Sequence, residues 1–319
     1  MQSISIIVPV KPGFKSAAIA AIRELSLEID CYEVFLSEGC APSRQRNLAA
    51  REASGDILYF LDDDSIINPN NLTLCSSVME DTAVSVAGGP SLTPATDTCL
   101  QKLFGRALAS PFGSGPVRNR YQMSGKARET TDKELILCNL AVRRSDFLVL
   151  GGFDERLYPN EENELLVRVR QAGHKLIHLP DMCVYRSQRQ SVTAFIRQMF
   201  AYGRGRAQQT LLSGEFSILS FIPMFFLLYL AFPLILVSHV IILIPLYAYL
   251  LLMLLFAVIE CIRSGTISSL LLVLIYPLMH LVNGAGLLIG LIGGKPMLKD
   301  DQGVVVRRIK KLGQDFEAQ

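Results

Sequence analysis

The sequence predicts an α/β protein, in which a doubly wound, Rossmann-like and mostly parallel sheet is followed by an α-helical membrane region. Two observations lead to this prediction. Up to residue 61, short apolar runs alternate with helical patterns, the order that builds parallel sheets with right-handed crossovers. Residues 216–292 are almost free of charge, although 19% of the whole chain is charged.

Each predicted element follows from its local pattern. The β-branched run 3–10 reads as a buried strand, because Pro12 and Gly13 follow it as turn residues. Further apolar runs and helical spacings predict the rest of the sheet region: strands at 33–36, 56–61, 83–89 and 134–144, and helices at 17–28, 43–54 and 161–172. The Gly-, Pro- and Ser-rich residues 90–133 read as long loops with one helix.

The membrane region has two kinds of segment. Residues 191–213 form an amphipathic, cationic pattern typical of an interfacial helix, with an ordinary surface helix as the alternative. The apolar stretches 216–237, 240–259 and 267–292 are each long enough to cross a bilayer. We therefore predict four parts: a catalytic domain at 1–190, an interfacial helix at 191–213, about three transmembrane helices at 214–294, and a polar tail at 295–319.

The tail creates a conflict within the sequence. Three crossings place residues 295–319 on the side opposite the catalytic domain, yet the tail carries six Lys and Arg residues, which favour the cytosolic side. We expect three crossings, with one re-entrant or interfacial segment as the alternative.

Composition excludes several classes of protein. A net charge of +2 without dense basic runs argues against binding to nucleic acid. The seven cysteines are scattered without a CxxC pair, which favours reduced thiols over a zinc site or a disulfide framework. The N-terminal decapeptide alternates into a strand pattern and is not expected to be a signal peptide.

Three carboxylates follow the predicted strand at 56–61. Asp62, Asp63 and Asp64 would repel one another at a strand end unless a cation neutralised them. Asp62 and Asp64, as alternate residues, can point oxygens to one side and leave positions for water and phosphate, as Mg²⁺ or Mn²⁺ requires. The sequence therefore predicts a divalent metal site, with an acidic helix cap as the alternative.

A second acidic cluster begins the helix predicted at 161–172. Glu161 and Glu162 could simply complement the helix dipole. Together with the first cluster they indicate a division of labour, in which one set holds metal and the other deprotonates an acceptor hydroxyl. A Glu crowded by other acids has a raised pKa, which suits a base that works near neutrality.

From residue 3 to about 209 the chain resembles the inverting family 2 glycosyltransferases of GT-A fold, and among them the succinoglycan-type exopolysaccharide glucosyltransferases. Single motifs are weak, but their order along the chain is specific. The matching motifs are Ile6-Ile7-Val8-Pro9-Val10, Arg46-Asn47, Gly55-Asp56 running into Asp62-Asp63-Asp64, Gly88-Gly89-Pro90, 110–115, Arg143-Arg144, 151–155, Asn160-Glu161-Glu162 and 197–204.

The resemblance implies a role for particular residues. Asp62 and Asp64 correspond to the DxD motif that holds metal and the ribose diphosphate, with Asp63 supporting the nucleotide. The donor implied is a nucleotide-diphosphate sugar, expected to be a UDP-sugar. Glu162 falls on the catalytic base, with Glu161 beside it; the remaining donor-site residues implied are Pro9, Val10, Glu38 and Arg46.

The chain departs from the family pattern in three places. The base is Glu162 in a Glu-Glu pair, where relatives carry Asp in a Glu-Asp pair. The nucleotide-binding turn appears as residues 37–40, which leaves Glu38 as its surviving acid. Only residues 41–43 separate that turn from the Arg44–Asn47 segment, so we expect a sheet with one unit fewer.

A lipid-linked acceptor would need cationic side chains at headgroup level. Arg197, Arg204 and Arg206 are candidates, with simple attraction to anionic lipid as the alternative. Asn139 and Arg143, in the strand predicted at 134–144, are further acceptor candidates.

Function is predicted as the inverting transfer of a single sugar from the nucleotide sugar to a polyprenyl-diphosphate-linked glycan, in bacterial polysaccharide assembly. The enzyme is expected in the cytoplasmic membrane as a multi-pass protein, with its catalytic domain in the cytosol and an undetermined oligomeric state. A polyprenyl-phosphate sugar synthase and an inactive scaffold that binds nucleotide sugar are the alternatives. A processive synthase is disfavoured, because its Gln-x-x-Arg-Trp motif needs a Trp and this chain has none.

Overall fold

The computed structural model describes residues 2–24, 32–231, 240–298 and 303–316. The chain divides into two compact units. The sheet unit comprises Met1–Leu92, Asn119–Arg186 and Met297–Gln319, and the helical unit comprises Thr93–Arg118 and Ser187–Pro296. Each unit is described by itself below.

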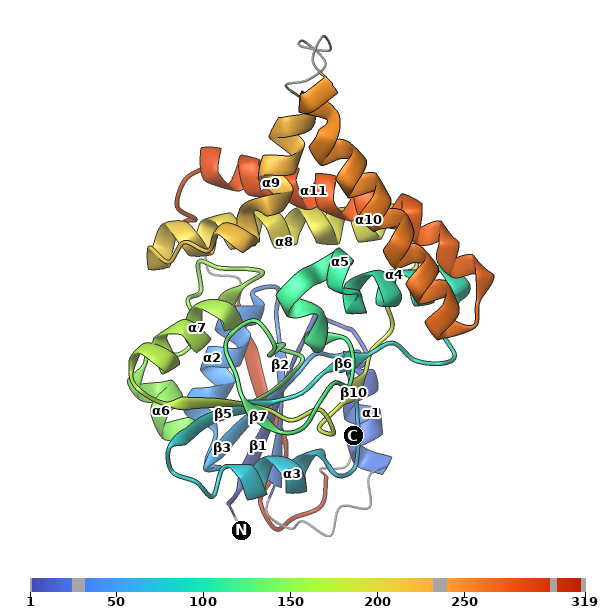
Figure 1. Ribbon diagram of the computed structural model, residues 1–319. Coiled ribbons are helices and arrows are strands. Elements are labelled where there is room, and N and C mark those ends of the chain that lie inside the picture. Colours follow the sequence, from blue (N-terminus) through green and yellow to red (C-terminus); the bar gives the residue numbers. More distant parts are fainter. Residues whose placement is uncertain (1, 25–31, 232–239, 299–302, 317–319) are drawn as a thin grey trace. The chain divides into compact units, whose positions relative to one another are not determined.

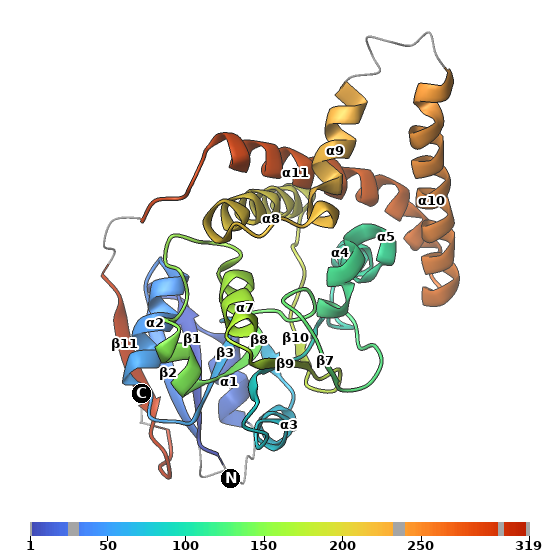
Figure 2. The same ribbon diagram turned by 60° about the vertical axis from the view of Figure 1, so that its left-hand side comes forward.

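The sheet unit is built on one eight-stranded sheet (Figures 1 and 2), with the strand order β11-β2-β1-β3-β8-β5-β9-β7. Five strands run in one direction, and the reversed strands are β8 and, at the two edges, β11 and β7. This confirms the predicted mostly parallel α/β sheet. The strands are β1 (Ile4–Val10), β2 (Tyr32–Glu38), β3 (Ile57–Leu61), β5 (Val84–Gly88), β7 (Arg128–Glu129), β8 (Asn139–Arg143), β9 (Lys175–His178) and β11 (Val305–Lys310).

Short helices and a second small sheet complete this unit. The helices are α1 (Ala17–Glu24), α2 (Pro42–Glu52), α3 (Asn71–Val78), α6 (Arg144–Val149) and α7 (Glu161–Gln171), and the small sheet contains β4 (Ile66–Ile67), β10 (Val184–Tyr185) and β6 (Ser91–Leu92). Pro42 begins α2 at a position where a missing N–H costs nothing.

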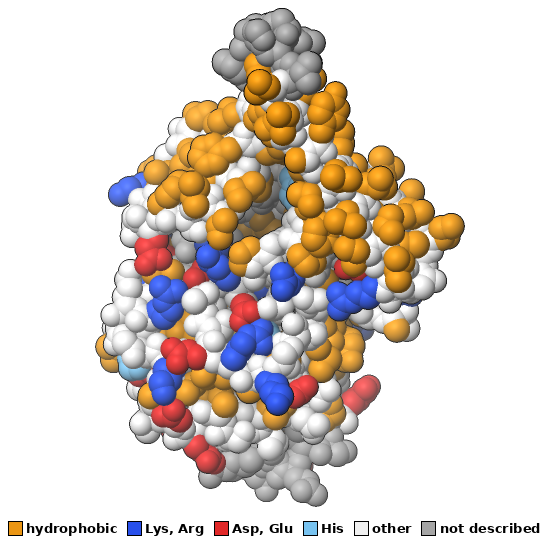
Figure 3. Space-filling model, viewed as in Figure 1, with side chains coloured by type: hydrophobic (Ala, Val, Ile, Leu, Met, Phe, Trp, Pro, Cys, Tyr) orange, Lys and Arg blue, Asp and Glu red, His pale blue; other side chains and the backbone are white. Residues whose placement is uncertain are grey.

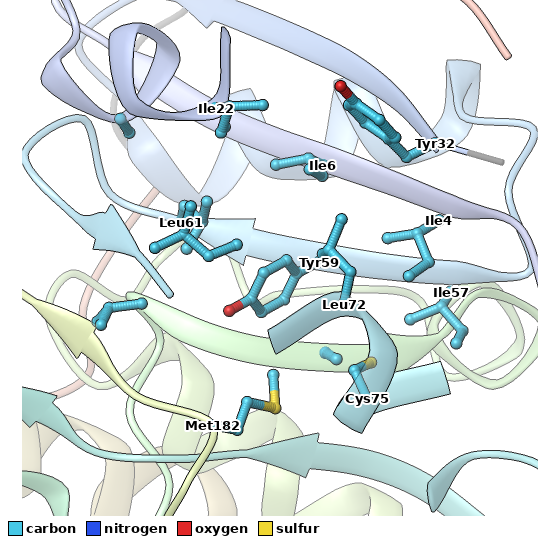
Figure 4. Packing of buried hydrophobic residues seen from close by; sticks show 14 of the residues in the cluster. Ile4, Ile6, Ile22, Tyr32, Ile57, Tyr59, Leu61, Leu72, Cys75 and Met182 are labelled. Carbon is cyan, nitrogen blue, oxygen red and sulfur yellow. The ribbon is translucent and has the colours of Figure 1, made fainter. Parts of the chain in front are cut away.

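Both faces of the large sheet are buried, as expected for strands without polar alternation. Every residue of β1 and β3 is buried. On one face Ile4, Ile6, Tyr59 and Leu61 pack with residues of α1 and α3, as Figure 4 shows. On the other face Phe60 packs against α6 and α7 residues. This double-sided core holds the end of β3 rigidly, immediately before the acidic triplet.

The helical unit contains α4 (Cys99–Ala109), α5 (Pro111–Ser114), α8 (Val192–Ser213), α9 (Ile218–Ala231), α10 (Val240–Ser264), the 3-10 helix η3 (Ile267–Leu271) and α11 (Leu272–Ile292). A second 3-10 helix, η1 (Gly115–Arg120), begins in this unit and ends in the sheet unit. Among the described residues, the segments Ile241–Ser264 and Ile267–Ile292 are long and apolar enough to cross a membrane by length and composition. The third predicted apolar stretch, 216–237, extends beyond the described residues.

The C-terminal tail differs from its prediction. Residues predicted as a free polar tail form β11, which pairs antiparallel with β2 at the edge of the large sheet. Lys310 is buried and donates a hydrogen bond to the carbonyl of Tyr32, 3.1 Å away. This pairing does not agree with the expected three crossings, because a strand cannot be hydrogen-bonded to β2 from across a bilayer.

Candidate active site

The acidic triplet lies at the sheet edge where the parallel strands end. β1 ends at Val10, β2 at Glu38 and β3 at Leu61, immediately before Asp62. Val10 and Glu38 are paired across β1 and β2, with Pro9 one position earlier. In sheets of this kind the carboxyl ends of the strands form the ligand-binding crevice. The structure thus brings the predicted nucleotide residues Pro9, Val10 and Glu38 to the same edge as the triplet.

The carboxylates of Asp62 and Asp64 both form ion pairs with the guanidinium of Arg186. The Nε of Arg186 lies 2.6 Å from Oδ1 of Asp64, and its Nη1 lies 3.1 Å from Oδ2 of Asp62. Arg186 follows β10, which pairs with β4 just after the triplet. Asp62 and Asp64 therefore converge on a single positive group, as their spacing in the sequence predicts.

Asp63 faces a different environment. Its carbonyl accepts hydrogen bonds from the amide of Ala18 at 3.0 Å and from Oγ of Ser16 at 3.1 Å, which fixes the triplet to the start of α1. Burial raises the pKa of the Asp63 carboxyl above its ordinary value, and the neighbouring Asp64 and Asp62 add to the rise. Burial and, to a smaller extent, the crowding of three acids at one strand end thus disfavour the charged form of Asp63.

Arg46 joins the two acidic clusters. This buried side chain of α2 donates through Nη2 to Oδ1 of Asp62 at 2.6 Å and through Nη1 to Oε1 of Glu161 at 3.2 Å. Glu161 is the first residue of α7, preceded by Asn160 in the left-handed conformation with φ 87°. Asp62 and Glu161, about a hundred residues apart in the sequence, are therefore both bound by the guanidinium of Arg46.

Glu161 is a strongly perturbed acid. Burial raises its pKa to about 8; the Arg46 guanidinium opposes this rise, and Glu162 and Asp62 increase it. Burial is the main cause of this rise in pKa, and the neighbouring acids contribute less to it.

Glu162 is held by a second buried arginine. Nη1 of Arg120 lies 3.4 Å from Oε1 of Glu162, and Nη2 of the same residue donates to the side chain of Asn163. Arg120 is itself fixed by the carbonyls of Lys133, at 3.0 Å from Nε, and of Asp132. The carboxylate of Glu162 is thus oriented by a side chain that has almost no freedom to move.

Sequence reasoning missed both Arg120 and Arg186. Arg120 lies in the stretch 90–133, which carries no periodicity that would indicate a site, and it meets Glu162 only through the fold. Arg186 ends a short run of strand-like residues, and nothing in its neighbours indicates acidic partners 122 residues earlier. Only the tertiary structure identifies them.

The two predicted acceptor residues of β8 lie at opposite ends of this strand. Asn139 is fully buried; its amide donates to the carbonyls of Pro90 and Met182, and its oxygen accepts from the Tyr59 hydroxyl at 2.5 Å. Arg143 pairs with Ile57, at the opposite end of β3 from Asp62. Because β8 runs antiparallel to β3, the side chain of Arg143 instead donates to carbonyls of the 79–84 turn. Asn139 thus lies opposite Leu61, at the end of β3 next to Asp62, with its side chain buried and hydrogen-bonded, whereas Arg143 lies at the far end of β3.

Glu38 has an unexpected partner. Nη2 of Arg307, in β11, lies 2.5 Å from Oε2 of Glu38. The turn predicted to bind the nucleotide therefore contacts a residue of the C-terminal segment, which the sequence prediction places outside the catalytic domain.

The carboxylates of Asp62 and Asp64 are suitable ligands for a hard divalent cation. Among the described residues, no three or more His, Cys, Asp or Glu side chains are grouped as a complete metal site. Two carboxylates that already converge on one cation, as Asp62 and Asp64 do on Arg186, match Mg²⁺ or Mn²⁺, whose other ligands are commonly water and substrate phosphate oxygens. The residues present therefore fit such an ion.

Known proteins share this architecture. The chain is similar to a mannosyltransferase from Pyrobaculum calidifontis solved in complex with GDP-Man and Mn2+, with a TM-score of 0.56 and 16% identity over 91% of this chain and 87% of that one. At this identity the likeness shows the fold, which is that of the GT-A glycosyltransferases. A weaker likeness, with a TM-score of 0.44 and 13% identity, links 95% of the chain to 98% of S. aureus TarS 1-349.

The sequence itself defines the family. Residues 57–260, more than half of the chain, match the family model described as glycosyl transferase family group 2. The chain belongs to this family and is a glycosyltransferase, as the resemblance implied. It is also 28% identical over 141 residues to the succinoglycan biosynthesis protein ExoA of Rhizobium meliloti (strain 1021), a match that spans 43% of this chain and 40% of that relative.

Proposed function

We propose that this glycosyltransferase moves a single sugar, with inversion, from a nucleotide-diphosphate sugar to a polyprenyl-diphosphate-linked glycan in the assembly of a bacterial polysaccharide. The observation that carries the proposal is Arg46, which holds Asp62 and Glu161 on one guanidinium. Asp62, from the proposed donor site, and Glu161, the neighbour of the proposed base Glu162, are therefore held by one side chain, which brings the two acidic clusters together as a direct displacement requires.

Asp62 and Asp64 hold Mg²⁺ or Mn²⁺ in this proposal. When bound, the ion neutralises charge on the leaving diphosphate. Asp63 supports the nucleotide, and Pro9, Val10 and Glu38 lie beside it at the ends of β1 and β2. The mannosyltransferase of similar fold is described with GDP-Man and Mn2+, which supports a nucleotide sugar and a divalent ion for this chain too. A UDP-sugar is our proposed donor.

Glu162 acts as the base that takes the proton from the acceptor hydroxyl. Its carboxylate is oriented by Arg120, so one oxygen has a fixed direction while the acceptor approaches. Glu161 is the companion acid beside the base, and burial raises its pKa. Arg46, which we expected only at the nucleotide, positions Glu161 against Asp62.

The membrane supplies the acceptor. ExoA is named for succinoglycan biosynthesis, and a related role here implies a growing glycan carried on lipid. Arg197, Arg204 and Arg206 of α8 are proposed to contact the lipid diphosphate; Arg197 and Arg204 are exposed. We place the enzyme at the cytoplasmic membrane with the sheet unit in the cytosol, which is where nucleotide sugars are made.

The test uses purified full-length protein in proteoliposomes. A panel of nucleotide sugars with Mn²⁺ is offered with polyprenyl-diphosphate-linked saccharides or with polyprenyl phosphate, and labelled sugar is counted in the lipid fraction. The proposal expects label only on the diphosphate-linked saccharide, together with release of a nucleoside diphosphate. Label on polyprenyl phosphate would identify a sugar-phosphate lipid synthase instead. If a donor raises the melting temperature but labels neither lipid, the protein binds sugar nucleotide without transferring to lipid.

A further inference from the structure

The C-terminal strand determines on which side of a membrane the chain ends. β11 pairs with β2 over a register that runs from Val305 opposite Glu38 to Lys310 opposite Val34. Ion pairs reinforce the pairing, since Nε of Arg308 lies 3.4 Å from the buried Glu33. Residues 305–310 are thus on the same side as the large sheet. A chain that leaves the sheet, enters a bilayer and returns to the same sheet crosses that bilayer an even number of times.

Helices α9 and α10 form an antiparallel pair. The Tyr229 hydroxyl, near the end of α9, donates to the carbonyl of Ile242, near the start of α10, at 2.6 Å. One turn earlier in α9, Phe226 stacks on Tyr249, further along α10, with ring centroids 4.2 Å apart. The two helices therefore run in opposite directions, and Figure 2 shows them side by side.

The surface of this pair is apolar and exposed. In the most apolar 18-residue window of α10 only 6% of residues are buried, against 39% in the segment that contains α11. Ile241 and Ile262, at the two ends of α10, are 78% and 77% exposed. Hydrophobic side chains crowd this part of the molecular surface in Figure 3. An exposed apolar helix of this length matches the thickness of a hydrocarbon core.

Helix α11 is packed against α8 at backbone distance. A Cβ added to Gly203 of α8 would lie 2.1 Å from the carbonyl oxygen of Asn283, and one added to Gly286 of α11 would lie 2.2 Å from that of Phe200. Gly290 makes a similar approach to Arg204. Asn283 donates to the carbonyl of Met199 at 3.2 Å, whereas Gly290, two turns later in α11, approaches Ala207, two turns later in α8. The two helices therefore run in parallel, and both views show them side by side.

This contact ties α11 to a charged helix. α8 carries Arg197, Arg204 and Arg206 and no stretch apolar enough to span a membrane. Arginines at the centre of a bilayer are costly, whereas a cationic amphipathic helix is stable in the headgroup region. A crossing by α11 would take α8 with it, because glycines bring their backbones into contact.

We propose that the pair α9–α10 crosses and recrosses the bilayer as a hairpin, while α11 lies in the membrane surface beside α8 without crossing. The chain then spans the membrane twice, and its basic C-terminal strand stays with the large sheet, which agrees with the preference of Lys and Arg for the cytosolic side. The inference rests on the membrane localisation proposed above and is independent of the reaction.

The test is the side-specific labelling of single cysteines in the full-length protein. Four exposed positions are changed one at a time, and intact cells are treated with a membrane-impermeant thiol reagent before and after lysis. The unmodified protein gives the background from its native thiols. The variants are Glu80→Cys in the sheet unit, Ile241→Cys at the start of α10, Ile267→Cys between α10 and α11, and Gln314→Cys beyond β11.

Only Ile241→Cys should be labelled in intact cells, and the other three should be labelled only after lysis. Labelling of Gln314→Cys but not Glu80→Cys from outside would overturn the even number of crossings. External labelling of Ile267→Cys would show that α11 crosses, and a silent Ile241→Cys would show that the hairpin does not. External labelling of Glu80→Cys and Gln314→Cys together would contradict the cytosolic localisation, yet it would support the shared side of the two segments.

Discussion

Arg186 bridges Asp62 and Asp64, the two carboxylates that we propose as metal ligands. Its Nε and Nη1 contact one oxygen of each carboxylate, at 2.6 and 3.1 Å. A cation that binds both carboxylates must displace this guanidinium. We therefore expect Arg186→Gln to bind Mn²⁺ more tightly than the unmodified protein when no nucleotide is present.

The magnitude follows from the exposure of the two ion pairs. The side chains of Arg186 and Asp62 are 22% and 21% exposed, and that of Asp64 is 46% exposed. Partly exposed pairs of this kind contribute about 0.2 to 1 kcal/mol each, so displacing both costs about 0.5 to 2 kcal/mol. Since 1.4 kcal/mol corresponds to about tenfold, the Kd for Mn²⁺ should fall by about 2- to 30-fold.

Calorimetric titration of purified protein with Mn²⁺ measures this change. Arg170→Gln is the matched control, because it removes the same charge from a side chain that is 42% exposed and pairs with Asp132, outside the triplet. An unchanged Kd in Arg186→Gln, or an equal change in the control, would refute the view that Asp62 and Asp64 are the metal ligands for which Arg186 competes.

Three further outcomes are expected. Glu162→Gln should lower the transfer rate by about 10²- to 10⁴-fold, while thermal stabilisation by donor and Mn²⁺ stays as in the parent; weaker donor binding would argue against a role as base. Burial raises the pKa of Glu134, but hydrogen bonds, above all from Arg128, lower it to about 2 from an ordinary value of 4.5. The lowered pKa stabilises the folded state above pH 4.5, and this stabilisation is lost as the pH falls toward 2. In denaturant titrations, the unfolding free energy of Glu134→Gln should therefore change less over this pH range than that of the unmodified protein, by about 1 to 3 kcal/mol. Gly286→Ala should destabilise the helical unit by about 1 to 3 kcal/mol, because its new Cβ would meet a carbonyl of α8, whereas Gly303→Ala, with open space around it, should leave the melting temperature unchanged.

Much of the sheet could be predicted because its signals are local. The apolar runs before Pro12 and before Asp62 are too short for helices and lie between turn residues, and they form β1 and β3. The metal-binding hypothesis for Asp62 and Asp64 arose in the same way, from carboxylates that directly follow a buried strand. The structure holds both on one cation.

What could not be predicted depends on strand direction and on distant partners. Arg143 was an acceptor candidate because it lies in the strand predicted at 134–144, but β8 runs antiparallel to β3 and places Arg143 at the end of β3 away from Asp62. Arg120 meets Glu162 across 42 positions of sequence, and no local pattern encodes that contact. The spacing of apolar residues in the sequence can predict a strand, but it does not predict which strands pair with it or in which direction they run.

The C-terminal segment contains a strand-like pattern that its charged residues made difficult to recognise. Residues 304–309 include Val304, Val305, Val306 and Ile309, a β-branched run typical of a strand. Because Arg307 and Arg308 interrupt this run, and because it follows apolar helices, we interpret it from sequence alone as part of a polar tail. In the structure these arginines pair with Glu38 and Glu33 at the sheet edge, so the charges belong to the strand pairing.

Sugar transfer by Asp64→Asn tests the central claim most directly, that the strand-end carboxylates form the donor site of a metal-dependent glycosyltransferase. The full-length variant is compared in proteoliposomes with Asp181→Asn, which changes an exposed carboxylate of the same unit. With folding verified by thermal melting, we predict a loss of at least about 100-fold in transfer for Asp64→Asn, because an ion held at this position contributes several kcal/mol, and no loss for the control. Transfer by Asp64→Asn at the parental rate with Mn²⁺ present would contradict the account.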